Sequence, residues 1–250
     1  MIAYGRWASV IYKTLRAGPV AYLPHGMDCA TFGHPVEEWE EPWVAEQLGP
    51  YVKREDLLIG CVATNQARKD LGLYFETLQV LKDRGWPVYG WLHTDVLVKA
   101  WSVSELIEAC GLQRRVTVST AAYTDRQLAT LYQRCALTMA PGLGEGFGYP
   151  IVESLASGRP VVHGDCGGGR ELVPKCEWRF PVRETRVDGI YAQRRPVFRA
   201  EDAANAIERV IGWQTEVGER TAAAYCKGAV AHLDWAALWP RWYAWIKQGL

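Results

Sequence analysis

Residues 136–164 read ALTMAPGLGEGFGYPIVESLASGRPVVHG, two apolar runs separated by a glycine-rich loop and an amphipathic segment. The predicted elements are a strand at 136–141, a helix at 149–158 and a strand at 159–164. Pro150 suits the first turn of this helix, and Gly158 suits its C-terminal cap. A strand, a helix and a strand in succession indicate a βαβ unit with parallel strands.

The same alternation recurs in the preceding part of the chain. Further strands are predicted at 57–64, 88–93 and 115–120, and further helices at 71–85, 104–111 and 125–135. Thr124 and Gln127 have the spacing of a capping box at the start of the last of these helices. Strands separated by single helices predict an α/β fold with a doubly wound, Rossmann-like parallel sheet.

The composition is that of an ordinary folded protein. The chain has 250 residues, 49% hydrophobic and 22% charged, which is enough for one large α/β domain or one domain plus an appendage. Lys and Arg together number 28, as do Asp and Glu, so no net field favours nucleic acid or anionic lipid as a partner. Any charged ligand must be held by a local site.

Cysteine usage and hydropathy bear on the compartment. The seven cysteines show neither CxxC nor Cys/His metal spacing, which indicates reduced thiols in a cytoplasm and argues against zinc. The sequence shows no signal peptide and no long uncharged apolar run. We therefore expect no transmembrane segment and no secretion.

The glycine-rich loop is the strongest candidate for a ligand site. Parallel sheets of this class bind ligands at the carboxyl ends of their strands, where loops lead into helix N-termini. Glycines alternate through residues 142–148 and allow the backbone to approach a ligand closely. The free amides before Pro150 lie at the positive end of the helix dipole. Anionic or hydroxyl-rich ligands suit this geometry.

Two glutamates lie in this loop and in the helix that follows it. Glu145 lies within it and Glu153 in the first turns of the helix, so we expect them to reach different parts of one elongated ligand. A glycosidase pair would instead face one bond from about 5 to 10 Å apart. The alternative is that Glu153 is a solvated helix residue and that the glycines only form a tight turn.

The sequence resembles a known family at several places in order. The stretch EGFGYPIVE looks like the Glu-x7-Glu motif of the retaining glycosyltransferases of family 4, which have the GT-B fold of two facing Rossmann-like domains. Other matching stretches are YLPHGMD at 22–28, NQARKDL at 65–71, the whole of 124–162 and GGGREL at 167–172. The resemblance covers residues 22 to about 175 and implies one half of a GT-B fold.

The resemblance implies roles for the residues of the motif. Glu145 would contact the hexose hydroxyls of a nucleotide-sugar donor, and the amides of Gly146, Phe147 and Gly148 would bind the same sugar. Glu153 would accept hydrogen bonds from the ribose hydroxyls. Carboxylates suit both tasks because they accept strong hydrogen bonds in pairs.

The diphosphate of the donor would meet positive charge and free amides. The resemblance places it at Lys69, at the helix start near residues 149–151, and at the turn around Gly168. Such groups stabilise the anion that forms as the glycosidic bond breaks. No metal or other cofactor is then expected, and the chain has no Asp-x-Asp motif.

Two positions near the donor leave alternatives open. Many relatives have an arginine where this chain has Thr64, and Arg68 either supplies the missing charge or is a solvated loop residue. The nucleobase would lie against residues 120–123. Tyr123 either stacks on the base or, as a residue just before a helix cap, packs against the protein.

The resemblance also predicts a division of the chain. We expect residues 1–50 to be a remnant of an N-terminal domain with its linker, 51–215 the donor domain, and 216–250 C-terminal helices. The family's catalytic histidine lies in the N-terminal domain. The expectation is therefore a truncated product or a natural donor-domain protein, with weak or no transfer by this chain alone.

The C-terminal segment carries an aromatic stripe. Four of the twelve tryptophans recur there at helical spacing, at positions 235, 239, 242 and 245. We expect protein to cover the stripe, either an N-terminal-domain partner or a second copy of the chain. Contact with the inner face of a membrane is the alternative to a wholly cytoplasmic protein.

Two functions follow from these observations. The first is a retaining glycosyltransferase that moves a hexose from a nucleotide diphosphate-sugar to an acceptor. The second is a nucleotide-sugar binding module that acts with a partner chain. A GT-B epimerase fits the Glu-x7-Glu stretch less well. The sequence identifies neither the sugar, the nucleobase nor the acceptor.

Overall fold

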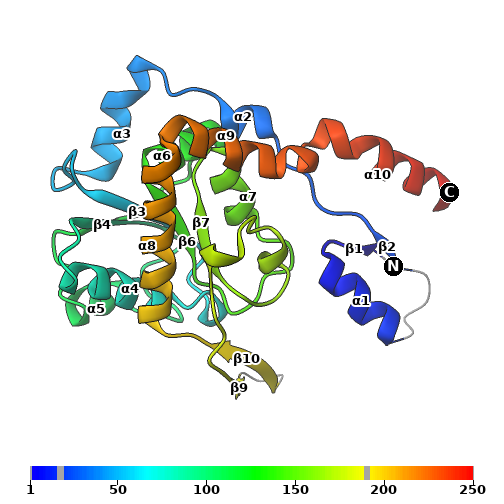
Figure 1. Ribbon diagram of the computed structural model, residues 1–250, viewed down its shortest axis with the longest axis horizontal. Coiled ribbons are helices and arrows are strands. Elements are labelled where there is room, and N and C mark those ends of the chain that lie inside the picture. Colours follow the sequence, from blue (N-terminus) through cyan, green and yellow to red (C-terminus); the bar gives the residue numbers. More distant parts are fainter. Residues whose placement is uncertain (1, 16–19, 189–191, 250) are drawn as a thin grey trace.

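The computed structural model describes residues 2–15, 20–188 and 192–249, and its centre is a six-stranded sheet with helices on both faces (Figure 1). All strand pairs in this sheet are parallel, in the order β5-β4-β3-β6-β7-β8. The strands are β3 (Leu57–Val62), β4 (Val88–His93), β5 (Val116–Ser119), β6 (Leu137–Ala140), β7 (Val161–Gly164) and β8 (Arg179–Phe180). The predicted α/β class and the doubly wound parallel sheet are confirmed.

Side chains of β4 show how both faces of the sheet are buried. Leu92 belongs to the large core beneath α4 (Leu71–Asp83), whereas Tyr89 and Trp91 belong to a second cluster on the opposite face. The first face also packs α5 and α8, and the second packs α3, α6 and α7. These helices are α3 (Glu41–Leu48), α5 (Val103–Ala109), α6 (Asp125–Arg134), α7 (Tyr149–Ala156) and α8 (Ala200–Val217).

The local signals place several element ends correctly. The strand predicted at 88–93 is β4 residue for residue. Thr124 and Gln127 form the predicted capping box, with the Gln127 amide donating to Thr124 Oγ1 over 3.3 Å. Helix α7 ends before Gly158, whose φ of 78° is the left-handed conformation expected of a capping glycine.

Residues 29–48 contribute to the sheet domain. Helix α2 (Cys29–Gly33) packs against α6 and α7. Val44 and Leu48 of α3 are buried against Leu58 and Trp91 of the sheet. Part of the segment predicted as remnant and linker therefore adds to the core of the sheet.

A β-hairpin leaves the sheet after β8 and precedes α8. Its strands, β9 (Glu184–Asp188) and β10 (Gln193–Val197), pair only with each other and are antiparallel. In Figure 1 the hairpin projects below β7 and α8. The sequence analysis does not predict this hairpin, because its strands are short and largely polar.

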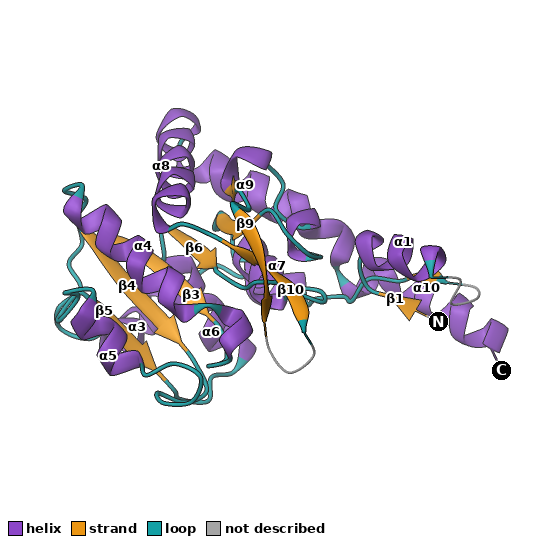
Figure 2. Cartoon of the chain, turned by 90° about the horizontal axis from the view of Figure 1, so that it is seen from below, coloured by secondary structure: helices purple, strands orange, loops and turns teal. Residues whose placement is uncertain are grey.

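The N-terminal segment and the C-terminal helix lie together at one end of the molecule (Figure 2). A small parallel pair, β1 (Ile2–Ala3) and β2 (Ala21–Tyr22), is linked through α1 (Arg6–Thr14). The C-terminal helices are α9 (Glu219–Val230) and α10 (Trp235–Gly249). The Trp242 indole N–H donates to the Pro24 carbonyl over 3.0 Å, which ties α10 to the linker.

The tryptophan stripe of α10 is half exposed in this arrangement. Trp235, Trp239 and Trp245 have exposed fractions of 40%, 55% and 37%. Trp235 also packs closely against Gly26, where an added Cβ would lie 2.3 Å from its ring. Trp235 and Trp242 therefore pack against the linker, whereas Trp239 and Trp245 expose aromatic surface.

Candidate functional site

The candidate site lies where the order of the strands reverses. β3 and β6 are neighbours in the sheet, and their chains continue to β4 on one side and β7 on the other, so right-handed connections put α4 and α7 on opposite faces. The loops that leave β3 and β6 therefore diverge and open a crevice at the carboxyl edge of the sheet. This switch point is where open α/β sheets bind their ligands.

An ion-pair cluster connects these two loops. Arg68 and Lys69 belong to the short helix η2 (Ala67–Lys69) after β3, and Glu145 lies in the loop after β6. Lys69 Nζ is 2.6 Å from Glu145 Oε1, and an Arg68 guanidinium nitrogen is 3.4 Å from Oε2. The Lys69 and Glu145 side chains are each 10% exposed, whereas Arg68 is 37% exposed. A buried, mutually neutralised pair thus lies at the centre of the crevice.

Glycines give the Glu145 side chain the space it occupies. A Cβ on Gly142 would lie 2.6 Å from Glu145 Oε1, in the position that the carboxylate needs to reach Lys69. A Cβ on Gly168 would lie 2.9 Å from the Gly146 carbonyl oxygen and 3.0 Å from that of Glu145. The Gly168 amide also donates to the Glu145 carbonyl over 3.2 Å. The backbone around Gly168 is therefore packed directly on the loop that carries Glu145.

Glu153 lies on α7 with a different partner. The buried Tyr132 hydroxyl of α6 donates to Glu153 Oε2 over 2.8 Å. Burial raises the pKa of Glu153 to about 7, although the Tyr132 hydrogen bond and the Lys69 charge both oppose the rise. Its side chain stays partly exposed at the wall of a groove. Glu153 is neither a solvated helix residue nor paired with Glu145.

Replacing Glu153 with glutamine should make the stability of the ligand-free protein less dependent on pH. The folded pKa of about 7 exceeds the ordinary value of 4.5, so the folded state binds this proton more tightly than the unfolded state. The resulting stabilisation is complete below the unfolded pKa and is lost as the pH rises through the folded one. In urea denaturation, Glu153→Gln should gain about 2 kcal/mol over wild type between pH 5 and pH 8.

The matched control is Glu216→Gln, which removes an exposed carboxylate from α8. Its difference in unfolding free energy from wild type should stay constant over the same pH range. A constant difference for Glu153→Gln as well would contradict the raised pKa.

A groove of about 570 Å³ runs from the ion-pair cluster along the carboxyl edge of the sheet. Arg68, Lys69 and Glu153 line it at one end, and residues 120–122 after β5 line it at the other. Thr64 contributes its hydroxyl to the same wall. The groove thus brings together the cationic loop, the second glutamate and the segment predicted to hold a base.

The loop residues before α7 differ in their exposure. Gly146 is exposed, Phe147 and Gly148 are buried, and Gly148 has a φ of 99° that only glycine adopts readily. Tyr149 and Pro150, at the start of α7, line the groove. The helix N-terminus therefore opens into the groove.

Tyr123 lies apart from the groove. Its hydroxyl donates to Gln47 Oε1 over 2.9 Å, and its ring packs edge-on against Trp43 with centroids 5.6 Å apart. It also lies against His93, whose pKa burial lowers. Of the two alternatives for Tyr123, the structure favours packing, here against α3. Arg68 contacts Glu145 with a partly exposed side chain, and its role at the diphosphate stays a prediction.

Two residues that the sequence analysis did not single out hold the site in shape. Asn65 is fully buried, and its amide donates to the carbonyls of Val96 and Trp101 over 3.1 and 2.8 Å, which anchors the loop after β3. Tyr132 holds Glu153 as described above. Asn65 is the first residue of the NQARKDL stretch and could have been flagged there, whereas Tyr132 reads in the sequence as an ordinary helix residue.

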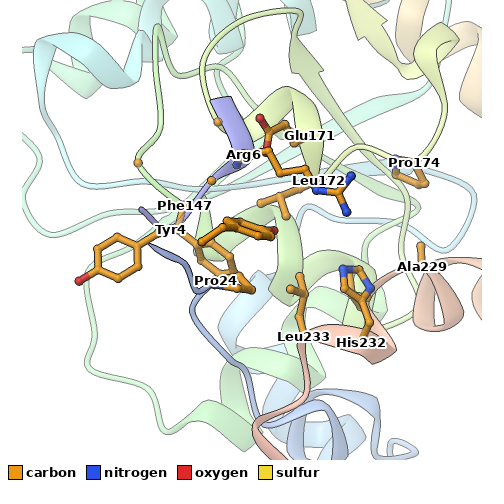
Figure 3. Close-up of a pocket in the computed structure, with 15 residues that line it drawn as sticks. Tyr4, Arg6, Pro24, Phe147, Glu171, Leu172, Pro174, Ala229, His232 and Leu233 are labelled. Atoms are coloured by element: carbon orange, nitrogen blue, oxygen red, sulfur yellow. Dashed lines mark hydrogen bonds between the residues drawn. The ribbon is translucent and has the colours of Figure 1, made fainter. Parts of the chain in front are cut away.

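A second cavity, of about 470 Å³, lies on the other side of the Glu145 loop, against the N-terminal segment (Figure 3). Arg6 and His232 point into this space from opposite sides. The Arg6 amide donates to Glu171 Oε2 over 2.8 Å, which joins α1 to the turn after β7. Beside the cavity, the Tyr4 and His25 rings stack 3.9 Å apart. Gly146 and Phe147, which follow Glu145, therefore form part of the wall of this cavity.

Within the described ranges, no three His, Cys, Asp or Glu side chains converge in a way that could bind a metal ion. In the same part of the chain, none of the helices combines the length and apolar character that crossing a membrane requires.

Comparison with known families and sequences agrees with this geometry. The family model of the glycosyl transferases group 1 matches residues 57–211, more than half of the chain. Over 186 residues the chain is 28% identical to the lipopolysaccharide core biosynthesis mannosyltransferase LpcC of Rhizobium leguminosarum bv. viciae. The match covers 68% of this chain and 50% of that protein, so the chain spans about half the length of this relative.

Solved structures show the same fold. The Anabaena protein Alr3699/HepE, in complex with UDP and glucose, superposes with a TM-score of 0.73 at 20% identity, covering 100% of this chain and 63% of that one. A glycosyltransferase from Rickettsia africae gives a TM-score of 0.77 at 14% identity, over 99% and 62%. At these identities the likeness establishes the fold, one Rossmann-like domain of a GT-B glycosyltransferase.

Proposed function

Because the chain belongs to the group 1 glycosyl transferases, we propose that it binds a nucleotide diphosphate-sugar at the switch-point groove and provides the donor half of a retaining hexosyl transfer. One observation carries this proposal. The cationic loop after β3 lines one groove together with Glu153 and the N-terminus of α7, and its Arg68 also lines an adjoining groove together with Glu145.

The groups that line the groove follow one another in the order that the parts of a nucleotide-sugar require. We assign the ribose to Glu153, whose carboxyl is oriented by Tyr132 and partly exposed at the groove wall. The base then lies toward residues 120–122, and the diphosphate lies over Lys69 at the N-terminus of α7. The structure of HepE supports this class of donor, because that protein was solved in complex with UDP and glucose.

The ion pair of Lys69 and Glu145 can be broken by the donor, and this frees Glu145 to bind the sugar. An entering diphosphate competes with Glu145 for the Lys69 ammonium, which is 2.6 Å from the carboxylate in the ligand-free protein. The carboxylate that is released can accept hydrogen bonds from hexose hydroxyls. Binding of the diphosphate thus frees the group that recognises the sugar.

The same cations serve the transfer step. As the bond between the hexose and the diphosphate breaks, negative charge accumulates on the leaving phosphate oxygens. Lys69, Arg68 and the amides at the start of α7 face this charge, and they stabilise it without reorganising. Because these groups supply the positive charge, our proposal includes no divalent metal.

The roles of the two glutamates can be separated by calorimetry. Glu153→Ala should weaken free nucleoside diphosphate and nucleotide-sugar alike, by about 10- to 100-fold, because both ligands contain the ribose. Glu145→Gln should spare or tighten the free diphosphate, since Lys69 loses its competitor, and should weaken the nucleotide-sugar. Equal losses for both ligands in both variants would contradict these roles.

A further inference from the structure

We propose that the groove between the β9–β10 hairpin and the Glu145 loop binds an anionic sugar, one that carries a carboxylate or a phosphate. The inference rests on the proposed function, since it concerns the sugar end of the same site. The sugar is either the hexose of the donor or a unit of the acceptor, and its negative charge is what the groove recognises in both cases.

The hairpin is placed to form a wall of the site. It follows β8 and precedes α8, so it starts from the carboxyl edge of the sheet, the edge that holds the ion-pair cluster (Figure 1). At its base, Arg183 makes a two-pronged ion pair with Asp202 of α8. The Arg183 amide also donates to the Val197 carbonyl over 3.0 Å. These bonds fix the start of the hairpin relative to the domain.

A groove of about 550 Å³ lies between this hairpin and the glycine loops. It adjoins the nucleotide groove, because Arg68 lines both. Glu145, assigned to the hexose, lines the hairpin groove as well. A ligand that extends from the ribose past the diphosphate therefore reaches this space next. The full lining consists of Arg68, Leu143, Gly144, Glu145, Gly146, Cys166, Gly167, Val182, Thr185, Gln193, Arg194, Arg195 and Pro196.

Most of the charged side chains that line this groove are positive. Arg68, Arg194 and Arg195 line the groove together with one carboxylate, Glu145, which is paired with Lys69. Across the ranges the structure describes, Arg194 forms no ion pair. Since the chain as a whole has equal numbers of acidic and basic residues, this excess of positive charge is local to the groove.

Arg195 is held in place by Gln193 and by an ion pair with Asp188. Its guanidinium donates to Gln193 Oε1 over 3.2 Å and lies 3.6 Å from Asp188 on the paired strand. Guanidinium groups recognise carboxylates and phosphates through paired hydrogen bonds, whereas neutral hydroxyls gain little from the charge. The groove therefore discriminates an acidic sugar from a neutral one.

The test uses Arg194→Ala/Arg195→Ala, with Arg54→Ala/Arg220→Ala as a control that removes the same charge from exposed sites elsewhere. Glucuronate and glucose 6-phosphate are titrated into protein labelled with ¹⁵N-arginine, with glucose as the neutral probe. We expect both anions to shift arginine side-chain signals and glucose to shift none. In the hairpin variant, but not in the control, both anions should bind about tenfold or more weakly.

The source of the sugar follows from repeating the titration with UDP-glucose, GDP-mannose and ADP-glucose all present. If these donors, whose hexoses are uncharged, displace the anions, the groove holds the donor hexose, and if the anions still bind, it holds an acceptor unit. Equal binding of the anions to wild type and the hairpin variant, or equal binding of glucose, would overturn the inference. Failure of the proposed function would appear separately, as absence of nucleotide binding by the wild type.

Discussion

Lys69→Met is expected to weaken the binding of free nucleoside diphosphate by about 100-fold or more. The substitution keeps most of the length of the side chain and removes the buried cation of the crevice, whose side chain is 10% exposed. Arg68 is more exposed and is 3.4 Å from Glu145, so it replaces only part of this charge. Isothermal titration calorimetry measures the effect directly.

The same variant should also lose stability, for a separable reason. Without Lys69, the mostly buried Glu145 carboxylate keeps only Arg68 as a partner, which costs about 1 to 3 kcal/mol. Lys69→Met/Glu145→Gln removes both charges and should recover most of that stability without recovering diphosphate binding. If the double variant bound diphosphate as tightly as wild type, Lys69 would not be a phosphate ligand.

Gly168→Ala is expected to weaken nucleotide-sugar binding by about tenfold or more while changing the affinity for free diphosphate by less than about threefold. The new Cβ would lie 2.9 and 3.0 Å from two backbone oxygens of the Glu145–Gly146 peptide units. Backbone atoms cannot rotate away, so the loop itself must move. The loop aims Glu145 at the hexose, whereas Lys69 and Glu153 belong to other elements.

Gly212→Ala is the matched control for this variant. Gly212 lies in α8, where an added Cβ meets nothing within 4 Å, so it should leave binding unchanged and slightly stabilise the helix. Comparable losses of free diphosphate and nucleotide-sugar in Gly168→Ala would show that the turn supports the whole site rather than the sugar loop.

The core of the fold could be predicted from local patterns. Apolar runs such as 88–93 and the capping signals at Thr124 and Gly158 depend on neighbours close in sequence, and the structure has them where expected. The alternation of strands and helices also predicts parallel strands joined by right-handed connections. The order of the strands, and with it the switch point between β3 and β6, comes from the structure alone.

The contacts within the site were less accessible from the sequence. The resemblance named Lys69 and Glu145 as ligands of different parts of the donor, but their direct ion pair across 76 positions depends on how two loops close over the sheet edge. Tyr132 orients Glu153 from a neighbouring helix, a contact set by helix packing. Tyr123 faces α3, a helix for which no prediction had been made.

The β9–β10 hairpin is the element that was hardest to predict from the sequence. Its strands are short, exposed and rich in arginine, so neither periodicity nor apolar content distinguishes them from a loop. They are held by pairing with each other and by the contact between Arg183 and Asp202 of α8. An element of this kind can be predicted only once the position of the helix that anchors it is known.

The most direct test of the central claim is a calorimetric titration of the wild-type chain with UDP, GDP and ADP, each in the presence of a chelator. A groove that uses Lys69, Glu153 and the N-terminus of α7 predicts that at least one of these binds with a dissociation constant below about 1 mM without metal. It also predicts that Lys69→Met abolishes the signal. Absence of binding by all three nucleotides, or binding that Lys69→Met leaves intact, would contradict a nucleotide-sugar site at this switch point.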